Sequence, residues 1–206
     1  MKKMKRLVCT LLAVLTVFGM FATTASAAFV SQSALATKAE SYKGDWGSYF
    51  RREYGFSGEW CEQFVGLCVE QAGLGDRYTY SEAGRMMKAF LSQKKLYLTT
   101  FYFNNSRQKS RLSELGININ SAWTTTSFVP KRGDVIFFQK GVYWCSHVGI
   151  VRSVDINVRT NQVTVRTVEG NCGDQVKYCT HEFNLKTGKL SDDDTFSYVT
   201  GFGRFN

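Results

Sequence analysis

The chain has 206 residues and a formal net charge of +9. This length suits a single domain with a substantial hydrophobic core. The lysines and arginines are scattered and form no block of five, so the composition argues against a nucleic-acid-binding groove and suits other anionic surfaces.

Residues 1–27 have the features of a secretory signal peptide. Four basic residues stand at or before the start of an apolar run at Leu7–Ala22, and Ala25–Ala27 fits the small-residue pattern of a cleavage site. The run is short for a membrane span, which needs about 20 residues. We therefore predict an exported protein with no stable membrane insertion after cleavage. Its mature domain is expected to span residues 28–206, with a net charge of +5, because the leader holds four basic and no acidic residues.

Helical periodicity dominates the first half of the mature chain. The predicted helices cover residues 31–42, a segment that begins at Cys61 and stops near Gly73, and residues 81–95. The aromatic and polar stretch 97–129 favours neither helix nor strand, and we assign no chemistry to it.

After Pro130 the pattern changes to short segments rich in β-branched and aromatic residues, separated by turn residues. The predicted strands cover residues 134–138, 147–158, 162–170, 176–183 and 196–205. Helices followed by strands indicate the α+β class, with N-terminal helices packed on one side of a C-terminal antiparallel sheet. The short connections favour a meander.

The mature chain has five cysteines, so at least one thiol has no partner within the chain. Cys61 and Cys68 are seven residues apart and share one face of their helix. Cys68 is expected in the core or in a disulfide, for which Cys145 is one candidate partner. Cys172 and Cys179 bracket a short turn-like stretch and are the preferred disulfide pair, although all four of these thiols being free is the other outcome.

Only two histidines are available for cysteine–histidine chemistry, His147 and His181. His147 opens one predicted strand, and Glu169 and Asn171 share one parity at the end of the next. A strand–turn–strand connection therefore places Glu169 beside His147. Cys61 would approach from the helix packed on that sheet, and we expect no role for His181.

Each of these groups has a chemical reason to be present. A cysteine thiolate is a nucleophile, and a helix N-terminus together with an imidazolium lowers its pKa. The imidazole takes the thiol proton and later protonates the leaving amine. A carboxylate on the other ring nitrogen fixes the tautomer, and a backbone N–H at the helix start can bind the oxyanion.

Four segments, "EWCEQFVGLC", "VPKRGDVIFF", "SHVGIVRSV" and "VRTVEGN", resemble in order and spacing the CHAP family, the cysteine, histidine-dependent amidohydrolases/peptidases. The resemblance covers roughly residues 28–205. It implies a papain-like α+β fold and cleavage of amide bonds in peptidoglycan. It also implies Cys61 as nucleophile, His147 as base, Glu169 as orienting acid and Asn171 as a fourth polar member.

Two residues beside Cys61 set the chain apart from the distantly related NlpC-type peptidases. These usually have Asp before the nucleophile and Gly two residues after it, where this chain has Trp60 and Gln63. Both are candidates for substrate binding, with Trp60 equally suited to anchor the start of the helix.

No cofactor or metal is expected, and no calcium requirement, because no D-x-D-x-x-G run precedes Cys61. One rival interpretation is a zinc-binding structural protein that uses two C-x-H pairs, Cys145 with His147 and Cys179 with His181. Another is a catalytically inactive wall-binding module with the same fold. We expect a secreted monomer acting on peptidoglycan, as an endopeptidase rather than an N-acetylmuramoyl-L-alanine amidase, because no glycan-binding module is recognisable.

Overall fold

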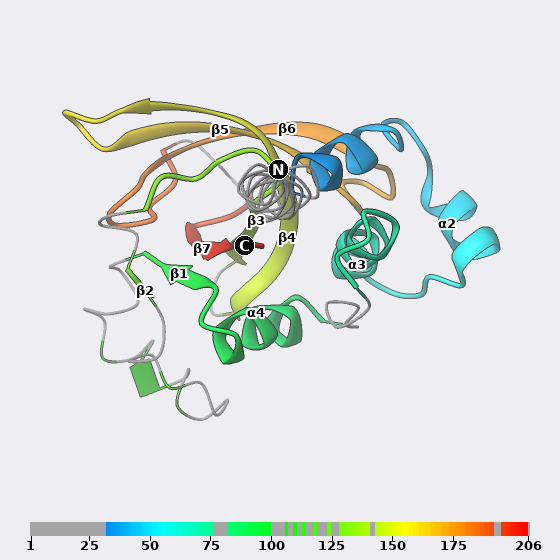
Figure 1. The fold of residues 1–206 in the computed structure, drawn as a ribbon, viewed down its shortest axis with the longest axis horizontal. Coiled ribbons are helices and arrows are strands. Elements are labelled where there is room, and N and C mark those ends of the chain that lie inside the picture. Colours follow the sequence, from blue (N-terminus) through cyan, green and yellow to red (C-terminus); the bar gives the residue numbers. More distant parts are fainter. Residues whose placement is uncertain are drawn as a thin grey trace, which may run out of the picture.

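The computed structural model describes residues 32–75, 82–99, 128–140, 143–191 and 195–205, with isolated positions between 106 and 124. Helices precede the main sheet, so the predicted α+β arrangement is confirmed (Figure 1). The predicted signal peptide lies outside the described residues. Within the described part of the chain, no helix is both long enough and apolar enough to cross a membrane.

The helices are a segment over residues 32–40, α2 (Gly47–Tyr54), α3 (Cys61–Gln71) and α4 (Ala83–Ser92). Helix α3 begins at Cys61 and ends before Gly73, as predicted. Gly73 has a left-handed φ of 73°, and the N–H of Leu74 donates to the carbonyl of Val69, which closes the helix end. Helix α2 was not predicted, and α4 is shorter than the predicted segment.

The strands are β1 (Leu96–Leu98), β2 (Trp123–Thr124), β3 (Val135–Lys140), β4 (Tyr143–Asn157), β5 (Gln162–Glu169), β6 (Lys177–Asn184) and β7 (Tyr198–Gly203). They form one seven-stranded sheet in the order β2-β1-β7-β3-β4-β5-β6. The predicted meander is present as β3 to β6. The sheet is antiparallel except for the short parallel pair β1–β2, which falls in the stretch without a predicted structure.

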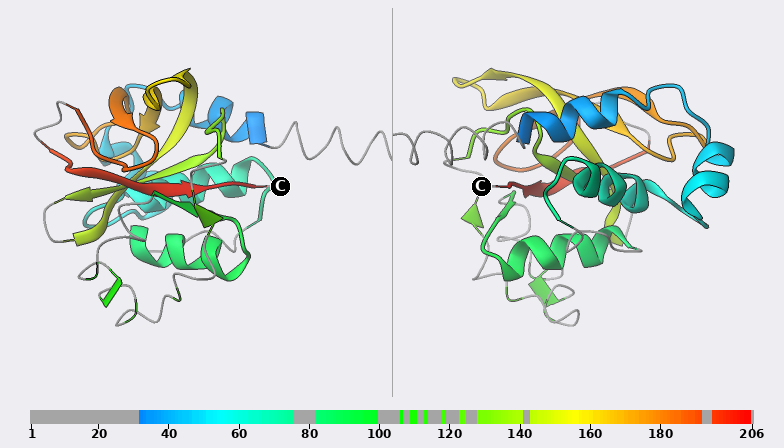
Figure 2. Two further views of the ribbon diagram at one scale, coloured as in Figure 1. Left: turned by 90° about the vertical axis from the view of Figure 1, so that its left-hand side faces the viewer. Right: turned by 45° about the vertical axis from the view of Figure 1, so that its right-hand side comes forward.

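Hydrophobic side chains fill both faces of the curved sheet. Alternate residues of β3 point to opposite sides, so Val135 and Phe137 join the core beneath the helices, while Ile136 and Phe138 join a second cluster on the other face. Helices α3 and α4 both contact β4, and they lie beside it in Figures 1 and 2. This packing brings the start of α3 against the strand that carries His147.

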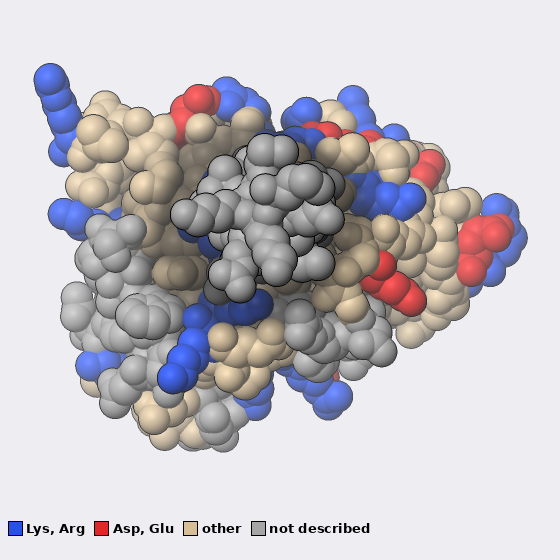
Figure 3. All heavy atoms as spheres, in the orientation of Figure 1, with Lys and Arg blue, Asp and Glu red and all other residues tan. Residues whose placement is uncertain are grey.

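Charged side chains do not gather in one field on the face shown in Figure 3. Lysines and arginines lie at several places around the outline, and acidic side chains lie between them. This is consistent with the scattered basic residues in the sequence.

Candidate active site

The Cys61 thiol lies at the first residue of α3 and is almost fully buried, with 4% of the residue exposed. Backbone N–H groups of Glu62 and Val148 act to lower the pKa of this thiol. Val148 is the residue after His147 on β4, so the helix start and the histidine strand meet at the thiol. These two N–H groups stabilise negative charge on the sulfur.

A second group beside the thiol was not anticipated from the sequence. Cys61 Sγ donates to Glu62 Oε2 at 3.2 Å, and both residues are buried. Burial raises the pKa of the Cys61 thiol, and the Glu62 carboxylate raises it further. The expectation of a lowered thiol pKa is therefore wrong for this arrangement, because the helix start is buried against β4 with a carboxylate alongside it. Burial also raises the pKa of Glu62.

Glu169 lies beside His147, where strand parity places it. His147 Nε2 is 2.9 Å from Glu169 Oε2, and only 1% of Glu169 is exposed. Gly149 makes room for this contact, since a Cβ there would come within 2.7 Å of Glu169 Cγ. An ionised carboxylate only accepts hydrogen bonds, so Nε2 carries the ring proton and Nδ1 keeps the lone pair that can take another.

His181 also belongs to this group, although the sequence interpretation gave it no role. Its Nε2 is 2.7 Å from Glu169 Oε1, and Thr167 Oγ1 donates to the same oxygen at 2.5 Å. Burial disfavours the charged carboxylate, but the bonds from His147 and His181 outweigh it and hold the pKa of Glu169 below its usual range. The pairing of β5 with β6 contained the signal, because it sets Cys179 opposite Thr167 and so turns His181 to the same face.

Asn171 lies in the turn after β5, with a left-handed φ of 60° that asparagine tolerates. Its side-chain amide donates to Glu59 and not to His147. The turn can pass close to α3 because residue 170 is a glycine, where a Cβ would come within 2.6 Å of Phe64. Asn171 lines the same cavity as His147.

The prediction that Trp60 binds substrate is wrong. Its side chain is fully buried, stacked on Phe50, and its indole N–H donates to Asp174 Oδ1 at 3.1 Å. Gln63 is likewise occupied, because its side-chain amide donates to the carbonyls of Ser57 and Glu59 and its oxygen accepts from the N–H of Ser57. Trp60 therefore anchors the start of α3, the other role that the sequence allowed, and Gln63 bonds to the loop that leads into this helix. Substrate binding by Gln63 stays a prediction.

Two neighbouring cavities meet at the proposed catalytic residues. One of about 480 Å³ is lined by Cys61 and Glu62, and another of about 720 Å³ is lined by His147 and Glu169. Glu59 and Ser146 line both cavities, so the two adjoin. No hydrogen bond joins the Cys61 thiol to the His147 ring within the described part of the chain.

The other cysteines divide between the core and the two cavities. Cys68 is fully buried in the core, which was one of its two predicted positions. Cys145 lines the cavity of Cys61. The preferred disulfide between Cys172 and Cys179 is absent, because both are free thiols with their sulfurs 3.7 Å apart. Three members of the two C-x-H pairs, His147, Cys179 and His181, line one cavity, whereas Cys145 lines the cavity of Cys61. The four residues therefore do not form one ligand group among the described residues.

A family model described as the CHAP domain matches residues 53–171, which is more than half of the chain. The chain belongs to the CHAP family. CHAP domains are generally cysteine amidases or peptidases of the peptidoglycan-hydrolase type, which supports the sequence resemblance and peptidoglycan as the class of substrate. The matched segment includes Cys61, His147, Glu169 and Asn171 but ends before His181. Comparison with curated proteins finds no match, and comparison with solved structures finds none either.

Proposed function

We propose that this CHAP protein is an exported peptidoglycan hydrolase that cleaves an amide bond through an acyl-enzyme on Cys61. The observation that carries the proposal is the buried Glu169–His147 pair on β5 and β4. His147 is followed directly by Val148, whose backbone N–H acts to lower the pKa of the Cys61 thiol. The family assignment supports the same chemistry.

The proposed reaction follows from the proton positions. Nδ1 of His147 takes the Cys61 proton, and the thiolate attacks the carbonyl carbon of the scissile amide. A backbone N–H at the start of α3 stabilises the oxyanion. His147 then protonates the leaving amine as the carbon–nitrogen bond breaks. Water, deprotonated by the same ring, cleaves the thioester, releases the acid and restores the thiol. Glu169 stabilises the imidazolium throughout.

The thiol has to exchange its hydrogen-bond partner before this reaction begins. It donates to Glu62 in the structure, and burial keeps it protonated. Substrate entering the cavity of Cys61 would therefore have to bring the sulfur from the Glu62 carboxylate to the imidazole. In this reading Glu62 holds the enzyme in a resting state that resists oxidation and alkylation of the thiol.

The walls of the Cys61 cavity favour a peptide substrate. Glu59, Glu62 and Glu82 line it together with Arg85 and Lys88, so carboxylates and cations face one hollow. Stem peptides of peptidoglycan carry both amino and carboxyl groups, which suits such a wall better than an uncharged sugar does. Both an endopeptidase and an N-acetylmuramoyl-L-alanine amidase have to accommodate the stem peptide, and of the two we propose the endopeptidase.

Digestion of purified peptidoglycan, followed by mass spectrometry of the fragments, tests the proposal. Sugars that retain shortened stems are the expected product. Peptide-free glycan strands would replace endopeptidase by amidase, and reducing sugar ends with intact stems would refute amide cleavage. A thiol-reactive probe separates the enzyme from an inactive wall-binding module, since a substrate-responsive Cys61 is labelled faster when peptidoglycan fragments are added.

A further inference from the structure

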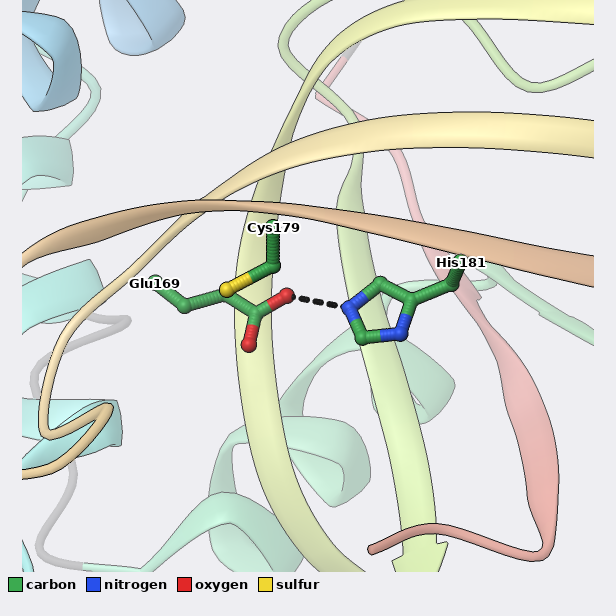
Figure 4. A group of neighbouring side chains, drawn as sticks. All are labelled: Glu169, Cys179 and His181. Atoms are coloured by element: carbon green, nitrogen blue, oxygen red, sulfur yellow. Dashed lines mark hydrogen bonds and ion pairs between the residues drawn. The ribbon is translucent and has the colours of Figure 1, made fainter. Parts of the chain in front are cut away.

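A compact group of metal-binding side chains lies behind the catalytic pair. The ligand atoms of Glu169, Cys179 and His181 are all within 4.8 Å of one another. Figure 4 shows the Cys179 sulfur close to the Glu169 carboxylate, with His181 bonded to one carboxylate oxygen. The Cys172 sulfur lies outside this compact group but is 3.7 Å from the Cys179 sulfur, so a small movement of its turn would supply a fourth ligand.

We propose that Cys172, Cys179, His181 and Glu169 Oε1 bind a zinc ion, and that the bound ion inhibits the hydrolase. Two sulfurs, one imidazole nitrogen and one carboxylate oxygen form a donor set typical of tetrahedral zinc. Binding releases the two thiol protons, so the thiolates and the carboxylate offset the charge of the ion. The inhibitory half of the proposal rests on the proposed function, and the binding half does not.

The sulfur separation fits a shared metal better than a disulfide. With Zn–S bonds of about 2.3 Å, a tetrahedral site places two sulfurs roughly 3.8 Å apart. The observed distance is 3.7 Å, whereas a disulfide requires about 2.05 Å. His181 Nε2 and Glu169 Oε1 are hydrogen-bonded at 2.7 Å, so these two ligand atoms need to move only slightly apart for both to bind the ion.

The backbone holds all four ligands on one hairpin. Glu169 ends β5, Cys172 lies in the turn, and Cys179 and His181 point to one face of β6. The N–H of Cys172 donates to the carbonyl of Gln175 at 3.0 Å, which fixes the turn. Such preorganisation lowers the conformational entropy lost on binding.

Glu169 and His181 form the buried side of the proposed zinc site, and the two cysteines face the cavity. Glu169 and His181 are 1% and 7% exposed, while the two cysteines are partly exposed and line the cavity of about 720 Å³. A hydrated ion can therefore enter through the cavity and exchange water for protein ligands.

Inhibition follows from where the ion would lie. A zinc ion on Oε1 leaves Oε2 for His147, so the ring keeps its position. Cys172, Cys179 and His181 line the same cavity as His147, so the bound ion would occupy the wall of that cavity and narrow the approach of substrate to the ring.

Titration of the purified, reduced protein with cobalt(II), a spectroscopic substitute for zinc, tests the binding half. One equivalent should give a thiolate-to-cobalt charge-transfer band that zinc abolishes. Cys179→Ser and Cys172→Ser should weaken it, with a loss of affinity of at least ~100-fold, since even outer-shell partners contribute about 10–100-fold. Cys145→Ser is the matched control and should keep the band. No band at one equivalent, or a band lost in Cys145→Ser and kept in Cys179→Ser, would overturn the site.

Peptidoglycan hydrolysis with added zinc tests the inhibitory half. Zinc should inhibit the wild type at concentrations that leave Cys172→Ser active. Equal inhibition of both proteins would place the inhibitory ion elsewhere, for example on Cys61 and His147, and would refute the coupling. A protein that binds cobalt as expected but hydrolyses no peptidoglycan would refute the proposed function alone.

Discussion

Glu62→Gln tests how strongly the carboxylate beside Cys61 suppresses ionisation of the thiol. Glu62 Oε2 is 3.2 Å from the sulfur. Two unit charges at that separation repel by about 1.3 kcal/mol even at the dielectric constant of water. This corresponds to about one pKa unit, and the lower effective dielectric of a buried site makes the repulsion larger. We therefore expect the substitution to lower the pKa of the Cys61 thiol by at least about one unit.

The rate of alkylation by iodoacetamide, measured against pH and assigned to Cys61 by peptide mass spectrometry, reports the thiolate fraction. Its midpoint should move to lower pH in Glu62→Gln. Glu59→Gln is the matched control, because Glu59 lines the same cavity but contacts Asn171 instead of the thiol. An unchanged midpoint in Glu62→Gln, or an equal shift in Glu59→Gln, would refute the proposed role of the neighbouring carboxylate.

Four further substitutions separate catalytic from structural roles. Cys61→Ala should abolish hydrolysis with an almost unchanged melting temperature, and activity in this variant would refute the mechanism. Cys68→Ala should instead lower the free energy of unfolding by about 1–3 kcal/mol, since Cys68 is fully buried. Glu169→Gln should lower kcat by about 10²–10⁴ through loss of ring orientation, and a decrease of less than tenfold in steady-state assays would contradict that role. Trp60→Ala should lower the free energy of unfolding by about 3–5 kcal/mol in urea titrations, and weakened substrate binding at full stability would return Trp60 to the substrate site.

The placement of the Glu169–His147 pair could be predicted because it depends on local rules. Alternation along two consecutive strands, joined by a short turn, fixes which side chains share a face. The structure pairs β4 with β5 and joins the two residues at 2.9 Å. The start of α3 at Cys61 and its end before Gly73 also follow from local signals, namely the apolar face and the glycine stop.

The corrected residues depend on contacts between distant segments. Trp60 is buried because α2 supplies Phe50 and the turn after β5 supplies Asp174. The sequence around Trp60 gives no indication of Phe50 or Asp174 as partners, and α2 itself was not predicted. The raised pKa of Cys61 has the same origin, because it results from packing the helix start against β4 with Glu62 enclosed.

The position of His181 follows from the same alternation of side chains along neighbouring strands that places Glu169 beside His147. The parity argument that paired Glu169 with His147 applies equally to the next strand, which sets His181 across from Val165 and on the face of Thr167 and Glu169. The Glu169 carboxylate therefore lies between the two imidazoles, and each of its oxygens bonds to a different ring. A carboxylate shared in this way cannot change its charge for one ring without affecting the other. Any ligand or substitution that acts at His181 is therefore expected to change how Glu169 holds the His147 ring, on which the proposed proton transfer depends.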